Sequence, residues 1–442
     1  MTHRIQDRRD TSRNMAPGVS SGVSPGTRAG GFYGWTVVAA AFAVAVFGWG
    51  VGFYGPPIFL KAVRDARGWS VGLVSGAMTV HFLMGAFAVA NLPLAYRRFG
   101  LPRVTVAGAA SLAVGVVGWA LAAEPWQLFA ATVLSGIGWV ALGAAGINAM
   151  VSPWFNRRRP AALSMAYNGA SMGGTIFSPL WVAAILWVGF PGAAIGIAAT
   201  MLCCVLFLSA RVLGRTPESM GTVPDGEAVG TSSIGPASPP PQAPVGSLWR
   251  DRAFLTLALG MAVGLFAQIG LIAHLFSMLV PALGAGGAGL AAGCSTAAAV
   301  LGRTLAGWFL PADADRRVVA ALNYGVQIAG CGAFLLASGT NVPLLLAGTV
   351  LFGLGIGNTT SIPPLIAQAE FTREDASWAV AKATAVSQAL YALAPAVFGA
   401  IRDAAGGEAV PWLFVVAAGC QAAAAAVYLS GRRVWRTRGA PV

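Results

Sequence analysis

Two basic residues lie inside segments that are otherwise apolar. Arg303 falls in "AVLGRTLAG" and Lys382 falls in "AVAKATAVSQ". A charge inside a bilayer costs several kcal/mol unless it faces a partner or a water-filled cavity. Arginine offers a planar fork that matches a carboxylate, and lysine offers a mobile point charge. Together the two side chains predict a binding site for an anion.

Neither cation has an evident counter-ion within the chain. All fifteen acidic residues are expected outside the membrane spans. Two uncompensated cations in a low-dielectric bundle are very costly unless an anion from outside supplies the missing charge. In the alternative interpretation each side chain extends to the membrane surface, because Arg303 and Lys382 lie about seven and about five residues from the cytoplasmic ends of their spans.

Tyr54 is a third candidate for the site. It precedes Gly55, Pro56 and Pro57 late in the first span. Proline breaks a helix because it lacks the backbone N–H group, so the two prolines predict a break beside Tyr54. The tyrosine hydroxyl is then expected either to donate a hydrogen bond to a carboxylate or simply to pack.

Four further polar residues fall within apolar segments. His81 and His274 could carry a proton or bond the substrate, although lone histidines in helices are commonly satisfied packing residues. Gln268 and Asn358 could contact a substrate or bond across helices.

The composition is that of an all-α integral membrane protein. Hydrophobic residues make up 56% of 442 positions, charged residues make up 10%, and the mean hydropathy is +0.70. The apolar segments suit helices that cross a core of roughly 30 Å and are too long for barrel strands. Twelve spans are predicted, at residues 35–60, 70–95, 104–123, 127–151, 163–186, 193–212, 253–280, 289–310, 318–338, 343–366, 378–400 and 411–430.

Basic residues set the expected orientation. Of the 28 lysines and arginines, the predicted cytoplasmic segments carry most, and only Lys61, Arg64, Arg67 and Arg402 are expected outside. By the positive-inside rule both termini are cytoplasmic. The net charge of +13 is explained by these clusters at span ends, so no nucleic-acid partner is expected.

The chain divides into two similar halves. "LSGIG" at 134–138 matches "LFGLG" at 351–355, and Phe155-Asn-Arg157 matches Phe371-Thr-Arg373. Parallel repeats of six spans are typical of transporters with a site between the halves. The predicted parts are a disordered tail (1–31), an N-terminal bundle (32–212), a flexible linker (213–252), a C-terminal bundle (253–430) and a second tail (431–442).

Several motifs resemble the major facilitator superfamily, and within it the branch of monocarboxylate transporters and oxalate/formate antiporters. They are "GGFYGW" (30–35), "SPWFNRRRPAALSMAYNGASMGG" (152–174) and "GRTLAG" (302–307). The resemblance implies that spans eight and eleven border a central cavity, where the oxalate antiporters similarly use an arginine and a lysine. An aspartate of the monocarboxylate branch is replaced here by Ala299, which favours antiport, uniport or a histidine route over proton coupling by that carboxylate.

The loop "PLAYRRFGLPR" (93–103) resembles the family's loop between spans two and three only in part. Pro93 and Arg97 stand where the family has glycine and aspartate. The charge interaction that usually links this loop to a helix therefore lacks its aspartate. The remaining positions of this loop, together with the basic cluster at 157–159, are expected to act either in gating or as topology-setting charges near anionic lipid. They are Arg98, Gly100, Arg103, Arg157, Arg158 and Arg159.

The sequence therefore predicts a secondary transporter of a small organic anion, a mono- or dicarboxylate, working by alternating access. The alternative is proton-coupled efflux of a hydrophobic or cationic compound on the same fold. An enzyme is not expected, because nucleophile-elbow, metal-ligand and phosphate-loop motifs are missing, and no cofactor is expected. The transporter is expected to act as a monomer. The scarcity of lysine beside arginine and the lack of sorting signals favour a bacterial cytoplasmic membrane.

Overall fold

The computed structural model describes residues 32–226, 248–309, 311, 314–406 and 411–432. The predicted N-terminal tail, residues 433–442 of the predicted C-terminal tail and residues 227–247 of the predicted linker lie outside the described residues. Within the described ranges the regular structure is helical, and no strand occurs there.

The helices form two sequential groups. The first group comprises α1 (Gly34–Gly52), α2 (Pro56–Arg67), α3 (Val71–Phe99), α4 (Leu101–Leu121), α5 (Pro125–Trp139), α6 (Ala144–Val151) and α7 (Arg159–Leu208). The second comprises α8 (Arg252–Phe309), α9 (Arg316–Ala337), α10 (Val342–Glu370), α11 (Arg373–Tyr391), α12 (Ala394–Ala404) and α13 (Pro411–Ser430). Short helices η1 (Ser152–Trp154), η2 (Ser209–Leu213), η3 (Glu218–Met220), η4 (Pro224–Gly226) and η5 (Leu248–Arg250) connect them.

Among the described residues, ten helical segments are long and apolar enough to cross a membrane. Two of them have 55 and 58 residues, or roughly 80 Å at the helical rise, more than twice the thickness of a bilayer core. Each is interrupted by one non-helical glycine, Gly189 with φ 72° and Gly284 with φ 67°. Each therefore consists of two helical stretches joined by a sharp turn, and these turns fall between the predicted spans 163–186 and 193–212 and between 253–280 and 289–310.

Prolines divide the first predicted span. Helix α1 ends at Gly52, and α2 starts with Pro56 and Pro57 in its first turn. Proline cannot donate to the carbonyl four residues earlier. The break predicted beside Tyr54 is present, and this tyrosine lies in the non-helical residues between α1 and α2.

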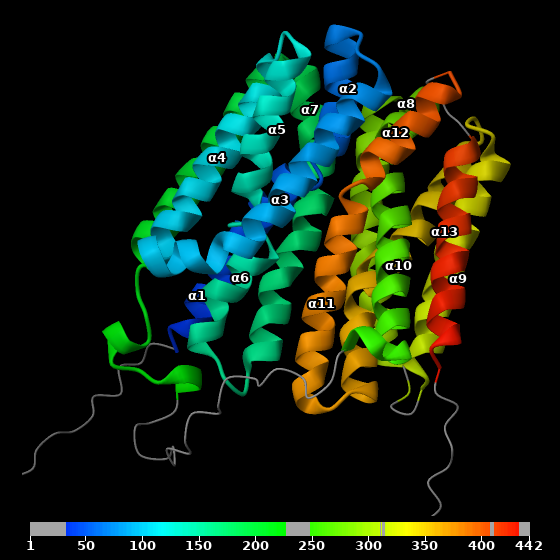
Figure 1. Ribbon diagram of the computed structural model, residues 1–442. Helices are drawn as coiled ribbons and strands as arrows, with labels where there is room; N and C mark the ends of the chain where they lie inside the picture. The colour runs from blue at the N-terminus through cyan, green and yellow to red at the C-terminus, as the bar shows by residue number, and fades with distance from the viewer. Residues whose placement is uncertain (1–31, 227–247, 310, 312–313, 407–410, 433–442) are drawn as a thin grey trace, which may run out of the picture.

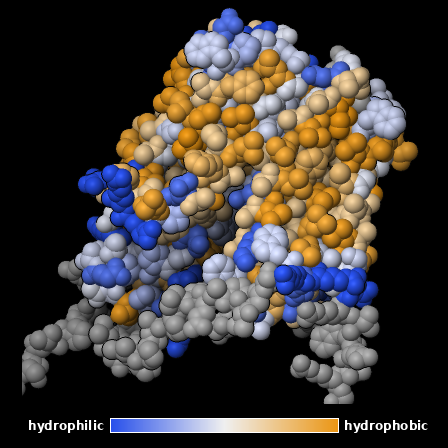
Figure 2. Space-filling view, viewed as in Figure 1, coloured by the Kyte–Doolittle hydropathy of each residue, from blue (hydrophilic) through white to orange (hydrophobic). Residues whose placement is uncertain are grey.

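The two groups lie side by side as two bundles (Figure 1). Helix α1 begins and α13 ends on the same side of the molecule, the lower side in Figure 1. Figure 2 shows apolar side chains as a broad belt, with hydrophilic ones gathered at the two ends. A belt of this kind is what a bilayer requires of a spanning protein.

On the upper side the two bundles are joined by hydrogen bonds. The Asp403 carboxylate, at the end of α12, accepts from the backbone N–H groups of Val71 (3.1 Å) and Gly72 (2.7 Å) at the start of α3. An acceptor at this place satisfies N–H groups that a helix leaves unpaired in its first turn. The Thr79 hydroxyl accepts from the backbone N–H of Ala396 (3.0 Å).

Toward the lower side the surface is hollowed between the two bundles (Figure 2). Hydrogen bonds thus join the bundles on the upper side, and the hollow between them lies nearer the lower side.

Candidate functional site

Tyr54 lies where the two bundles meet. Its backbone N–H donates to the carbonyl of Trp49 (2.8 Å), which turns the chain out of the α1 helix. Its ring packs on Gly174 of α7. A Cβ atom at Gly174 would lie 2.7 Å from both the Tyr54 ring and the Cγ2 atom of Thr296 in α8. Only glycine leaves room here, so the glycine-rich fifth span positions the tyrosine.

Arg303 lies on the second half of α8, against α10. A Cβ atom at Gly357 would be 3.2 Å from the Nε atom of Arg303. The side-chain amide of Asn358 donates to the carbonyl of Gly302 (3.2 Å), which fixes α10 against α8 beside the arginine. Asn358 thus forms a hydrogen bond between helices, which is one of its two predicted roles.

The Arg303 guanidinium is only partly satisfied. The side chain is half-buried, and its Nε is enclosed without a hydrogen-bond partner among the described residues. The Tyr54 side chain interacts electrostatically with Arg303. An enclosed guanidinium that lacks a carboxylate partner is energetically costly.

A small cavity adjoins Tyr54 and is lined by both bundles. Its wall is mainly apolar, with hydroxyl groups from tyrosine, serine and threonine side chains. The lining residues are Tyr54, Pro57, Ile58, Ser178, Ile272, Leu275, Phe276, Ala292, Ser295, Thr296 and Ile356. The Thr296 hydroxyl bonds to that of Thr175 across the bundles (3.2 Å). The sequence did not single out these serines and threonines, because such residues are common in membrane helices.

Lys382 lies in α11 and is half-buried. Its ammonium group is 6.0 Å from the centre of the Trp378 ring, one turn earlier in the helix. Among the described residues, no hydrogen bond or ring contact links Lys382 to Tyr54 or Arg303.

His81 supports the break in the first span. Its Nε2 lies 2.9 Å from the carbonyl of Gly52, which lost its helical donor to Pro56. Its Nδ1 lies 2.8 Å from the hydroxyl of Ser135. Both ring nitrogens thus have partners, and the carbonyl requires that Nε2 carry the proton. The side chain is buried, with 1% of its surface exposed.

His274 is buried in a polar cluster near the upper side. Its Nε2 lies 3.1 Å from the carbonyl of Pro395, and its Nδ1 lies 3.3 Å from the Arg402 guanidinium. Arg402 also donates to the Ser277 hydroxyl (2.7 Å). Arg402 lies in the last turn of α12 with only 2% of its surface exposed, a burial that the sequence did not predict. An arginine at a span end is indistinguishable from a loop arginine until the packing is known.

Gln268 ends a chain of buried amides inside the second bundle. Its Oε1 accepts from Gln327 (3.0 Å) and from the Thr359 hydroxyl (2.8 Å), and the Oε1 of Gln327 accepts from Gln421 (2.7 Å). The Gln268 Nε2 donates no hydrogen bond among the described residues, and it is not fully enclosed. Gln268 therefore retains a free donor in a side chain that is 3% exposed.

The basic loop residues lie at helix ends on the lower side. Gly100 joins α3 to α4 with φ 82°, a conformation that favours glycine. Arg98 and Arg103, on either side of it, are exposed. At the start of α7 the Asp225 carboxylate accepts from the backbone N–H groups of Asn156, Arg157 and Arg158.

Arg159 caps the preceding segment. Its guanidinium donates to the carbonyls of Phe155 (3.0 Å) and Ser152 (3.2 Å). These contacts are structural in the state described.

An ion pair joins two helices of the second bundle just beyond the predicted span 343–366. Glu370, at the end of α10, forms an ion pair with Arg317 at 2.6 Å. Arg317 is 1% exposed. The pair binds α9 to α10 at the lower end of the second bundle, away from Arg303.

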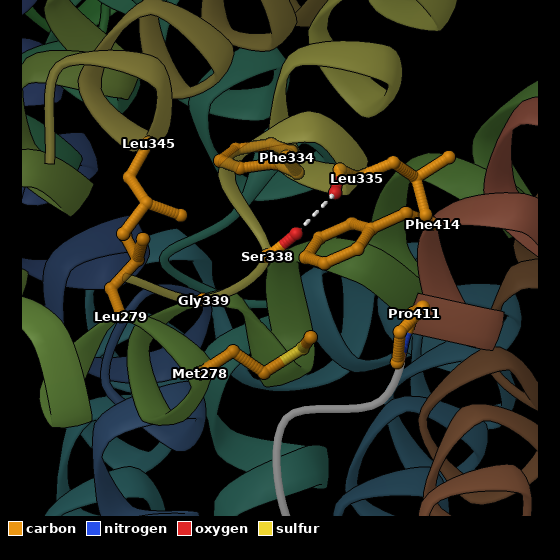
Figure 3. Close-up of a pocket in the computed structure, with 9 residues that line it drawn as sticks. All are labelled: Met278, Leu279, Phe334, Leu335, Ser338, Gly339, Leu345, Pro411 and Phe414. Carbon is orange, nitrogen blue, oxygen red and sulfur yellow. Dashed lines mark hydrogen bonds between the residues drawn. The ribbon is translucent and has the colours of Figure 1, made fainter. Parts of the chain in front are cut away.

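A separate cavity of about 160 Å³ lies near the upper end of the second bundle (Figure 3). Its lining is mostly apolar and holds no charged group among the described residues. The nine residues are Met278, Leu279, Phe334, Leu335, Ser338, Gly339, Leu345, Pro411 and Phe414. Because it contains none of the predicted site residues, it is distinct from the Arg303 region.

Two bundles of apolar helices that meet at a small cavity are the architecture of many membrane transporters. Residues 38–398 match the family model of the Major Facilitator Superfamily, and the chain belongs to this family. It is a transporter and not an enzyme.

The relatives place the chain among known transporters at low identity. An MFS-type transporter of Gibberella moniliformis is 25% identical, over 93% of this chain and 92% of that protein. Human monocarboxylate transporter 11 is 26% identical, over 76% of this chain and 69% of that protein. A crystal structure of the nucleoside transporter NupG aligns with a TM-score of 0.67 at 12% identity, over 90% of this chain and 98% of that one.

These matches confirm the predicted family and the resemblance to monocarboxylate transporters. The oxalate/formate resemblance stays a prediction. The curated relatives named here come from a fungus and a mammal, which does not fit the expected bacterial origin.

Proposed function

We propose that the chain is a secondary transporter that moves a small organic anion, a mono- or dicarboxylate, by alternating access. Arg303 carries this proposal. Its guanidinium is half-buried beside Tyr54, and its Nε has no hydrogen-bond partner among the described residues. A carboxylate supplies both the missing charge and two acceptor atoms for the planar fork. Tyr54 adds a neutral hydroxyl donor next to it.

Lys382 is the second cation of the proposed site. It contacts Trp378 on its own helix. It adds a second positive charge to the proposed site. The Lys382→Ala variant therefore tests whether this second charge contributes to transport in addition to Arg303.

The proposed orientation has both termini in the cytoplasm, because exposed Arg98 and Arg103 lie on the lower side with the start of α1 and the end of α13. In that orientation the side on which hydrogen bonds join the bundles faces the outside, and the hollow between them lies nearer the cytoplasm. The monomer is the proposed working unit, since both halves of the site come from one chain.

Counterflow uptake into proteoliposomes tests the function. Labelled oxalate, formate, lactate, pyruvate and a dicarboxylate are offered to wild type and to the Arg303→Ala, Tyr54→Phe and Lys382→Ala variants. Arg250→Ala, at an exposed arginine away from the site, is the matched control. Protein-free liposomes give the passive leak of the protonated acids.

We expect saturable uptake of at least one anion by wild type and by Arg250→Ala. Arg303→Ala should lower uptake by about 30-fold or more, because loss of a desolvated charge partner costs about 2–5 kcal/mol. If Arg303→Ala transports as well as wild type, the anion proposal is wrong.

Efflux of a hydrophobic or cationic compound is the second candidate. The mainly apolar lining of the cavity beside Tyr54 supports it. A transporter of this kind would move a lipophilic cation in the same proteoliposomes, and Arg303→Ala would leave that transport intact or raise it by removing a repelling charge.

A further inference from the structure

Five aromatic side chains, Tyr54 among them, follow one another along the first bundle. Phe53 is 5.0 Å from Tyr54 between ring centres, and Trp139 is 6.2 Å from Phe53. Trp49 lies 6.2 Å from Trp139 and 6.5 Å from Tyr167. These five residues, Trp49, Phe53, Tyr54, Trp139 and Tyr167, are here called the aromatic wall.

The aromatic wall is not an ordinary part of the core. Each of its five side chains is half-buried, whereas Phe59, Trp119 and Trp181 higher in the same bundle are fully buried. The rings meet mostly edge to face and leave ring surface open. The wall therefore has space in front of it.

Two members of the aromatic wall, Tyr54 and Phe53, lie near the second bundle. Tyr54 lines the cavity to which both bundles contribute. Phe53 also contacts Phe82 (5.8 Å), which contacts Tyr391 of α11 in the second bundle (6.1 Å). Trp49 precedes Tyr54 by about one and a half helical turns, toward the lower side, where Figure 2 shows the hollow between the bundles.

The two sides of the site thus differ in chemistry. The first bundle offers faces and edges of aromatic rings, and the second offers the Arg303 guanidinium. Aromatic rings prefer edge-to-face or offset contacts with other rings over contact with a saturated group of equal size. A ligand that matches both sides carries a negative charge at one end and a flat ring at the other.

We propose that the transported anion is an aromatic carboxylate, with its carboxylate on Arg303 and its ring against the aromatic wall. This rests on the proposed function, because it takes Arg303 as the anion site. It adds a preference for an aromatic over an aliphatic body of the same size and charge.

Ligand binding to the purified full-length protein tests this without interference from membrane leak. The shift of the thermal unfolding temperature is titrated with benzoate, cyclohexanecarboxylate, lactate and oxalate, since a ligand that binds the folded state raises this temperature. Benzoate and cyclohexanecarboxylate share charge and carbon count and differ in the ring electrons. Benzoate should bind about tenfold more tightly than cyclohexanecarboxylate.

Substitutions in the aromatic wall test which residues produce the preference for benzoate over cyclohexanecarboxylate. Trp139→Leu and Trp49→Leu should each reduce the benzoate advantage to about twofold or less, and Trp139→Phe should restore most of it. Trp187→Leu, at a tryptophan that is 87% exposed, is the matched control and should change nothing. Arg303→Ala should abolish binding of both ring acids.

The outcomes separate the two proposals. Equal affinity for benzoate and cyclohexanecarboxylate, or binding of lactate or oxalate alone, overturns the aromatic preference and leaves the anion function standing. Binding of benzoate that is unchanged in Arg303→Ala overturns both, as does a lack of binding and of uptake for every carboxylate.

Discussion

At the residue scale, His81 and Pro56 act as a pair. Proline removes the N–H group that would bond the Gly52 carbonyl, and His81 supplies a replacement at 2.9 Å. Trp181 does the same for the carbonyl of Gly50 through its indole N–H (3.1 Å). The two buried side chains hold open the break that presents Tyr54.

His81→Ala should therefore act on stability. It leaves the Gly52 carbonyl buried without a donor, so we expect the free energy of unfolding to fall by about 1–3 kcal/mol. Thermal unfolding of the purified protein measures this. The shape of the pH profile of transport should stay that of wild type. A variant of wild-type stability whose transport had lost its pH dependence would instead identify His81 as a proton carrier.

At the element scale, close contact of α7 with α1 and α8 positions the site. Gly174→Ala places a methyl group 2.7 Å from the Tyr54 ring and from Thr296. The ring must move, so we expect the KM for the anion to rise about tenfold or more, as measured by counterflow. Gly196→Ala in the same helix is the control, because nothing lies within 4 Å of its added methyl group.

The control variant should transport normally and be slightly more stable, since alanine favours a helix over glycine by about 1 kcal/mol. If Gly174→Ala behaves in the same way, Tyr54 does not depend on this contact.

Hydropathy and prolines predicted the elements well. The twelfth span, 411–430, coincides with α13, and Pro56 with Pro57 located the break beside Tyr54. The turns at Gly189 and Gly284 are shorter than predicted, because one left-handed glycine suffices to reverse the chain. Local patterns carry this information because each depends on neighbouring residues.

The candidate site was predictable only in part. Arg303 stood out because a charge in an apolar run is rare. Apart from Tyr54, which the neighbouring prolines pointed to, the aromatic wall gave no such signal, and neither did Ser178 and Thr296, since hydroxyl and aromatic residues are ordinary in membrane helices. The burial of Arg402 depends on how helices far apart in the sequence pack.

At the scale of the whole molecule, Asp403 links the two bundles on the upper side. It caps α3 from the opposite bundle. Loss of a cap costs about 0.5–2 kcal/mol, so Asp403→Ala should raise the population open on the upper side about twofold to 30-fold. Asp65→Ala is the control, because Asp65 pairs with Lys61 within α2 at 2.8 Å.

Spin labels on cysteines at Arg67 and Ala405, in a background without the native cysteines, report this change as a distance distribution. Asp403→Ala should enlarge the long-distance fraction, and Asp65→Ala should not. Identical distributions in all three proteins would show that this cap does not hold the upper side closed.

The central claim is that Arg303 binds the anion. Isothermal titration of the purified protein with the carboxylate that wild type transports best, compared with Arg303→Gln and Arg303→Lys, tests it most directly. Glutamine keeps hydrogen-bond donors but loses the charge, so its Kd should rise about 100-fold, within the 2–5 kcal/mol typical of a desolvated pair. Lysine should retain part of the affinity. A Kd for Arg303→Gln within about threefold of the wild-type value would contradict the account.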